Sequence, residues 1–141
     1  MTTVSSTVPA LDRTALALTV LRVAIGIIFV AHGYQKFFEY TLPGTTAAFT
    51  KMGVPLAQLV APAVATIELL GGLALLLGFG TRVAASLLAL TMLGALVLVH
   101  AKAGFFNPGG IEFPLALLAA SVALALAGPG AYSLDSLRKR A

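Results

Sequence analysis

The chain has 141 residues, of which 59% are hydrophobic and only 10% are charged, and its formal net charge is +4. Soluble domains rarely carry so few charges, because they must cover their surface with polar groups, so the composition predicts an integral membrane protein. The absence of cysteine excludes disulfides, cysteine-ligated zinc and Fe–S clusters, and no basic face with interleaved aromatic residues is present to bind nucleic acid.

Four long apolar segments follow a polar N-terminal tail, predicted over residues 1–14. Each approaches the roughly 20 residues needed to cross the hydrocarbon core of a bilayer. The backbone has no water to bond inside that core, so each segment is expected to be a helix. The predicted helices cover residues 15–33, 56–79, 81–100 and 111–127. The fold class is therefore all-α, an integral membrane four-helix bundle over residues 15–131.

Residues 34–55 differ from the spans, because they mix aromatic, charged and turn residues. A short interfacial helix is predicted over residues 47–52, with Thr45 or Thr46 as its N-cap. Gly53 would end this helix and Pro55 would lead into the next span. We interpret the segment as a connector on the membrane surface in preference to a substrate lid. Turns are predicted at residues 78–82 and 128–130.

The distribution of Lys and Arg predicts the orientation in the cell membrane, because basic residues favour the cytoplasmic side. An even number of spans places both termini on one side. That side would carry Arg13, Arg82, Arg138, Lys139 and Arg140, whereas the other would carry Lys36, Lys51 and Lys102. Both termini are therefore predicted to be cytoplasmic. Residues 132–141 form a basic cytoplasmic tail, in which Asp135 is predicted to cap a short helical turn.

Two charged residues interrupt the apolar spans, and an ionised group there needs a partner or a polar cavity. Arg22 lies in the first span and Glu68 in the second, and antiparallel neighbouring helices would let them meet. The pair either fixes the register of the two helices or borders a functional cavity. Glycines are expected to let these helices pack closely; they are Gly26, Gly33, Gly71 and Gly72.

A second polar cluster is predicted near the opposite, outer surface. Its members are His32, Lys36, His100 and Glu112. They suit a pocket for a quinone headgroup or a small anion, with Glu112 accepting a proton. Alternatively, His32 and His100 could ligate a haem, although interfacial histidines that bond headgroups or loop carbonyls are the preferred explanation. No other metal site is predicted.

Several segments in order resemble the DoxX family of small bacterial and archaeal membrane proteins. These segments are LRVAIGIIFVAHGYQKF, MGVP, IELLGGLALLLGFGTR, GGIEFPLALLAA and GPGAYSLD. The resemblance implies four spans and recurrent polar positions at Arg22, His32, Lys36, Glu68, Arg82 and Glu112. It also implies a link to quinone oxidoreductases and to oxidative-stress assemblies. "Oxidoreductase" would then describe a complex, because this chain has no thiol.

Four functions follow as hypotheses. The first is an accessory subunit of a membrane redox or oxidative-stress complex that binds a quinone or lipid-like molecule and docks protein partners. The second is a small proton-coupled transporter, functioning as a homodimer, with Glu68 and Arg22 as its relay. The third is a haem protein that uses His32 and His100. The fourth is a membrane scaffold whose charges only set helix packing.

Overall fold

The computed structural model describes residues 12–138, and within this range the chain is helical without any strand. The helices are α1 (Arg13–Tyr34), η1 (Gln35–Glu39), α2 (Thr41–Lys51), α3 (Ala57–Leu77), α4 (Thr81–Ala95), η2 (Leu96–His100), α5 (Glu112–Ala127) and α6 (Leu134–Arg138). Most of the predicted N-terminal tail, together with Lys139 and Arg140, lies outside the described residues.

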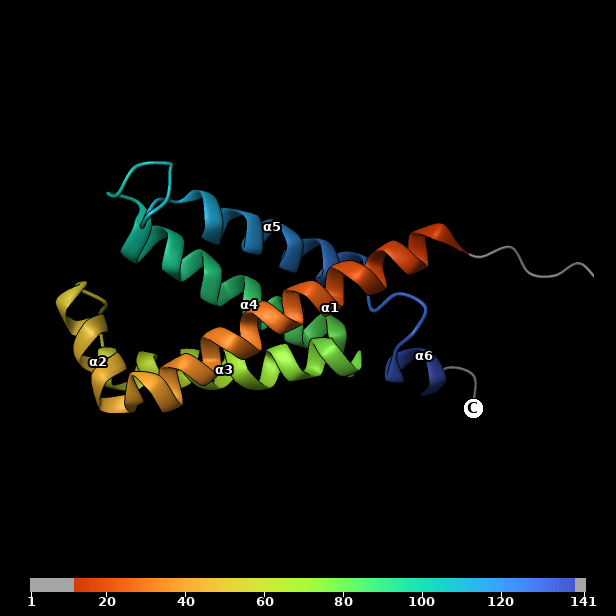
Figure 1. The fold of residues 1–141 in the computed structure, drawn as a ribbon, viewed down its shortest axis with the longest axis horizontal. Helices are drawn as coiled ribbons and strands as arrows, with labels where there is room; N and C mark the ends of the chain where they lie inside the picture. Colours follow the sequence, from red (N-terminus) through yellow and green to blue (C-terminus); the bar gives the residue numbers. More distant parts are fainter. Residues whose placement is uncertain (1–11, 139–141) are drawn as a thin grey trace, which may run out of the picture.

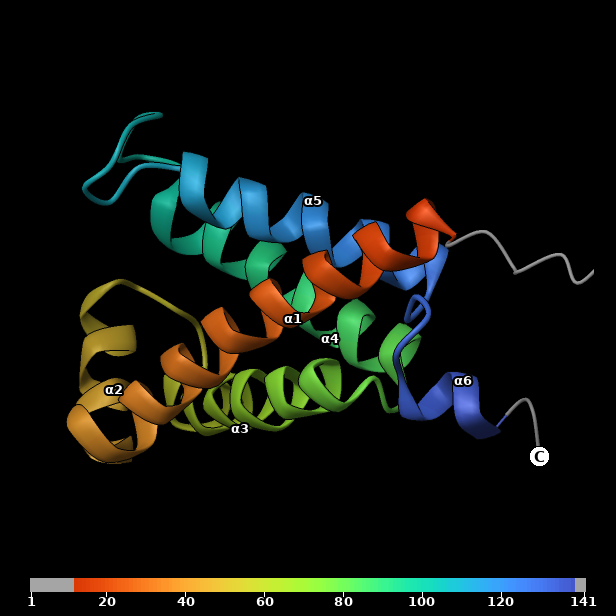
Figure 2. The same cartoon turned by 45° about the vertical axis from the view of Figure 1, so that its right-hand side comes forward.

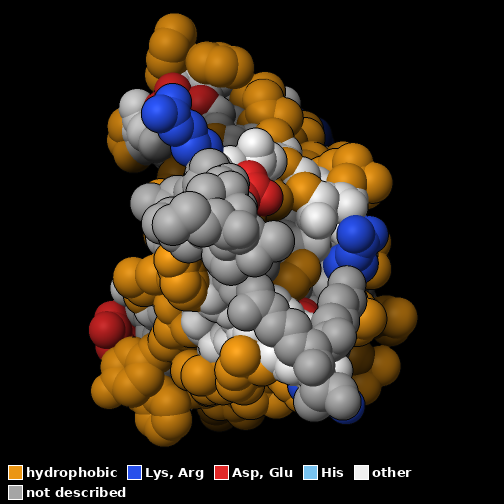
Figure 3. Space-filling view, turned by 90° about the vertical axis from the view of Figure 1, so that its right-hand side faces the viewer, with side chains coloured by type: hydrophobic (Ala, Val, Ile, Leu, Met, Phe, Trp, Pro, Cys, Tyr) orange, Lys and Arg blue, Asp and Glu red, His pale blue; other side chains and the backbone are white. Residues whose placement is uncertain are grey.

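The predicted all-α membrane bundle is confirmed. Three helical segments of the described chain are long and apolar enough to cross a membrane; they are Arg13–Glu39, Ala57–Leu77 and Thr81–His100. The helix predicted as the fourth span, α5, is apolar but shorter than these three segments. Hydrophobic side chains lie around the rim of the end that Figure 3 shows, and large ones are exposed along the helices, among them Val20, Leu59, Leu90 and Leu126. These helices therefore present an apolar surface to lipid.

The bundle consists of two helix pairs that diverge toward one end. α1 packs on α3, and α4 packs on α5, with α3 also contacting α4. Both ends of the described chain, α6 and the α3–α4 turn lie together at what we call the terminal end (Figure 1). At the opposite end, which we call the α2 end, α2 lies beside α1 and α3, whereas η2 and α5 lie on the other side (Figures 1 and 2).

The connector between the first two spans differs from its prediction. Helical structure continues beyond residue 33 through the π-helix η1, and α2 begins at Thr41. Thr45 is therefore inside a helix, and the predicted N-cap at Thr45 or Thr46 is wrong. The Thr45 hydroxyl instead donates to the carbonyl of Lys36 at 3.0 Å, which ties α2 to η1. Gly53, at φ +78°, follows the end of α2 as predicted.

The two predicted turns are confirmed. α3 ends at Leu77, and both Gly78 and Gly80 adopt positive φ before α4 begins at Thr81. Gly78 is also closely packed, because a Cβ there would lie 2.9 Å from Nη1 of Arg22. Gly128 ends α5 in a different backbone conformation, with φ +95° and ψ −162°.

Asp135 caps a different helix from the one predicted. Its carboxylate accepts hydrogen bonds from the backbone N–H of Gly80 at 2.8 Å and of Thr81 at 2.9 Å, both at the start of α4. Gly80 has no side chain that could serve as the N-cap, so a distant residue supplies the acceptor. The short helix α6 is capped by Ser133, whose Oγ accepts from the N–H of Ser136 at 3.0 Å.

This cap predicts a pH-dependent contribution to stability. Burial acts to raise the pKa of Asp135, but the hydrogen bonds from Thr81 and Gly80 and the charge of Arg138 outweigh it, so the pKa lies below its ordinary value. A lowered folded-state pKa means that the contribution is complete above the unfolded pKa, about 3.9, and is lost as the pH falls through the folded value.

We expect Asp135→Ala to lower the free energy of unfolding by about 1 kcal/mol at neutral pH, the usual cost of losing an N-cap. Thermal unfolding in detergent, followed by circular dichroism from neutral pH to about pH 3, measures it. The difference between the variant and the wild type should shrink as the pH drops below about 4. A difference that stayed constant across this range would show that the carboxylate charge is not involved.

Candidate functional site

Arg22 is a buried structural centre at the terminal end, with 1% of its surface exposed. Its guanidinium donates to the carbonyls of Leu75 and Leu76 at the end of α3, the latter at 2.9 Å. It also donates to the carbonyls of Pro129 at 2.9 Å and Tyr132 at 2.5 Å. The positive charge therefore satisfies the last carbonyls of α3 and holds the C-terminal segment against the bundle.

Glu68 pairs with Lys36, and the expected pairing of Glu68 with Arg22 is wrong. Lys36 Nζ lies 2.5 Å from Glu68 Oε2, and Glu68 is only 3% exposed. The register of α1 on α3 explains why Glu68 pairs with Lys36 and not with Arg22. Arg22 lies opposite Leu75 and Leu76, which are about 11 Å along α3 from Glu68.

Small residues fix this register. A Cβ on Gly33 would lie 2.7 Å from Cα of Leu69, and a Cβ on Gly72 would lie 2.7 Å from the backbone nitrogen of Val30. Gly26 faces the carbonyl of Gly72 in the same α1–α3 contact. Any side chain at Gly33 or Gly72 would separate the two helices.

Gly71 belongs to a different contact, between α3 and α4. A Cβ there would lie 3.1 Å from Cγ of Leu88. The four predicted packing glycines thus serve two helix contacts.

A cavity of about 1080 Å³ lies at the α2 end, between the α1–α3 pair and the α4–α5 pair. Most of its lining is apolar, from residues such as Phe29, Phe49, Val64, Leu90, Phe113 and Leu117. Its ionisable lining residues are His32, Lys36, Tyr40, Glu68 and His100. Thr45, Ala48 and Phe49 of α2 also line it, so the segment predicted as a plain connector covers the cavity.

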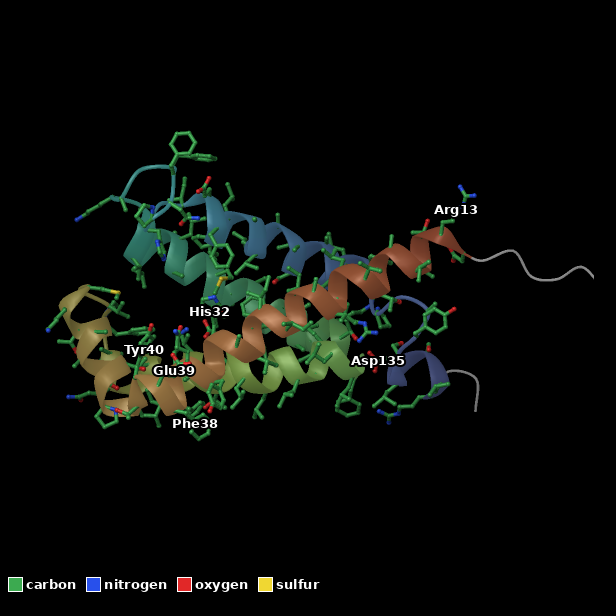
Figure 4. The ribbon with its side chains drawn as sticks, viewed as in Figure 1. Arg13, His32, Phe38, Glu39, Tyr40 and Asp135 are labelled. Atoms are coloured by element: carbon green, nitrogen blue, oxygen red, sulfur yellow. The ribbon has the colours of Figure 1, made fainter. Side chains whose placement is uncertain are left out.

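The structure brings three of the four predicted outer residues to this cavity. His32, labelled in Figure 4, has its ring centroid 5.9 Å from that of Phe113. His100 Nδ1 lies 2.6 Å from the carbonyl oxygen of Gly109 and donates a hydrogen bond to it, because a carbonyl oxygen only accepts. Glu112 is not part of the lining, because its carboxylate accepts from the N–H of Asn107 at 2.7 Å.

The arrangement can hold an amphiphilic molecule. Lys36 Nζ donates to Oε2 of Glu68, which leaves the ammonium two further N–H groups and the carboxylate a second oxygen. The pair can therefore offer both a donor and an acceptor to a polar headgroup, while the apolar walls receive hydrocarbon. Within the described part of the chain, no group of three or more His, Asp or Glu side chains is placed to hold a metal ion. Haem ligation by His32 and His100 remains a prediction.

The chain is similar to known membrane proteins. A family model described as DoxX matches residues 17–101. The chain is 42% identical over 115 residues to a Bacillus subtilis protein named "Putative oxidoreductase CatD", with 82% of this chain and 81% of the relative covered.

Two Escherichia coli proteins are also similar. Inner membrane protein YqjF is 37% identical, with 84% of this chain and 88% of the relative covered. Inner membrane protein YphA is 31% identical, with 84% and 87% covered. No solved structure matches the chain.

Proposed function

Because the chain belongs to the DoxX family of membrane proteins, we propose that it is an accessory subunit of a membrane redox complex and binds a quinone in the cavity at the α2 end. The observation that carries this proposal is the Lys36–Glu68 pair, 2.5 Å apart, in a cavity of about 1080 Å³ with mostly apolar walls. Binding sites for small molecules usually combine apolar walls with a few placed polar groups.

The pair supplies the groups that a quinone headgroup needs. An ammonium N–H of Lys36 donates to a ring carbonyl, and a Glu68 oxygen accepts from the hydroxyl of the reduced form. Glu68 takes the proton-acceptor role that the sequence assigned to Glu112, which does not line the cavity. The name of the Bacillus subtilis relative supports a redox context. With both termini in the cytoplasm, the site would lie near the outer surface.

Copurification tests the proposal. Protein extracted from membranes with a mild detergent is expected to retain about one quinone per chain, measured by mass spectrometry of an organic extract. The double variant Lys36→Met with Glu68→Leu should lose it, although the fold should survive, because replacing both members of a buried ion pair by apolar residues is often neutral for stability.

Two results would contradict the proposal. One is a wild-type protein that, in lipid nanodiscs supplied with quinone, binds none. The other is a double variant that retains as much quinone as the wild type. Proteins that copurify with the wild type from crosslinked membranes identify the complex, and no redox enzyme among them would contradict the accessory role.

A further inference from the structure

The cavity extends along α3 and α4 beyond the charged pair. Near the terminal end these two helices are in close contact, where Gly71 faces Leu88. Farther toward the α2 end, α4 runs beside α5 and away from α3 (Figures 1 and 2). There the cavity is lined by Val60 and Val64 from α3 and by Leu90 and Gly94 from α4. The two helices therefore separate just beyond the Gly71–Leu88 contact.

Gly94 differs from the packing glycines of α1 and α3. A Cβ at Gly94 would meet no atom within 4 Å, so no neighbouring helix requires glycine there. Glycine inside a helix is less favourable than alanine by about 1 kcal/mol. At this position the missing side chain leaves space in a cavity whose other walls are mostly apolar.

The walls near Gly94 are exposed and apolar. Leu90 is 64% exposed and Leu98 is 46% exposed, and both line the cavity. Leu90 lies about 14 Å along the helix from the start of α4, near the middle of a hydrocarbon core of about 30 Å. An opening at this depth faces lipid acyl chains and not water.

We infer that the space between α3 and α4 is a lateral channel for the hydrocarbon chain of an amphiphile, and that Gly94 determines how bulky a chain it admits. This inference rests on the proposed function for the position of the headgroup, beside Lys36 and Glu68. The cavity of about 1080 Å³ exceeds the roughly 300–1,000 Å³ of ordinary small-molecule pockets, so a ring alone would not fill it. The isoprenoid chain of a quinone and the acyl chain of a lipid share the required chemistry.

Binding to reconstituted protein tests the channel. Three probes are titrated into lipid nanodiscs: a methyl-substituted benzoquinone, the same ring bearing a decyl chain, and lauric acid. The affinity of each probe is compared between the wild type and Gly94→Phe. Partitioning of the probe into lipid affects both proteins equally and therefore cancels. Leu93→Phe is the matched control, because Leu93 is exposed and does not line the cavity. Gly94→Leu replaces Gly94→Phe if the larger side chain prevents folding.

We expect Gly94→Phe to weaken binding of the decyl quinone about tenfold, equivalent to about 1.4 kcal/mol, and to change binding of the chainless ring less than about twofold. Leu93→Phe should change neither. Equal weakening of both quinones, or no effect of Gly94→Phe on the decyl quinone, would overturn the channel and leave the proposed quinone site intact. Lauric acid binding that depends on Gly94, with no quinone binding, would support the channel and contradict the quinone. Absence of binding by every probe would overturn both.

Discussion

Arg22→Met is expected to lower the free energy of unfolding by about 3–5 kcal/mol, because several carbonyls lose a charged donor and each buried polar group left unsatisfied costs about 1–3 kcal/mol. The substitution removes the guanidinium donor from the carbonyls of Leu76, Pro129 and Tyr132, and from that of Leu75, which still accepts from the N–H of Gly78. Buried polar groups that lose their partners cost their full desolvation energy. The C-terminal segment would then depend on Asp135 for its attachment to the α3–α4 turn.

Thermal and denaturant unfolding in detergent measure this effect. Arg22→Lys should recover only part of the loss, because an ammonium lacks the planar fork of donors that reaches several carbonyls. Arg13→Met is the control, since Arg13 is exposed at the start of α1. A loss below about 1 kcal/mol for Arg22→Met, similar to the usual effect of a surface substitution, would show that Arg22 does not hold the terminal end together.

Gly33→Ala is expected to destabilise the bundle by about 3 kcal/mol, the upper part of the range for overpacking. The new Cβ would lie 2.7 Å from Cα of Leu69, and backbone atoms cannot move aside as a flexible side chain can. α1 and α3 would have to separate, which would also pull Lys36 away from Glu68.

The matched control is Gly94→Ala, which places the same methyl group in open space. It should leave the melting temperature unchanged or raise it slightly, because alanine favours a helix by up to about 1 kcal/mol over glycine. If Gly33→Ala were as well tolerated as Gly94→Ala, the α1–α3 contact would be looser than the structure shows.

The apolar segments were enough to predict the bundle and its main turns, because lipid forces such segments into helices. Arg22, Gly26 and Gly33, which the sequence marked as charged or packing positions, form a stripe on the face of α1 that packs on α3. Lys36 continues that stripe by one turn and is the partner that sequence reasoning missed for Glu68. The predicted helix ended at residue 33, whereas η1 carries the helix on to Glu39.

Other features depended on contacts between distant segments. Asp135 caps α4 from 54 residues away, measured from Thr81, and no local pattern marks such a pairing. Arg22 bonds backbone carbonyls, which every residue carries, so its partners cannot be identified from side-chain types. The cavity arises from the divergence of α3 and α4, which depends on packing across the whole bundle.

The central claim is that the Lys36–Glu68 pair binds a ligand, whereas Arg22 serves only the structure. The most direct test is the affinity of the decyl quinone for nanodiscs that contain the wild type or the Lys36→Met, Glu68→Leu double variant. For the double variant, the claim predicts a melting temperature close to that of the wild type. It also predicts binding of the decyl quinone weakened at least about tenfold, which corresponds to about 1.4 kcal/mol. Unchanged affinity in a folded double variant would contradict it.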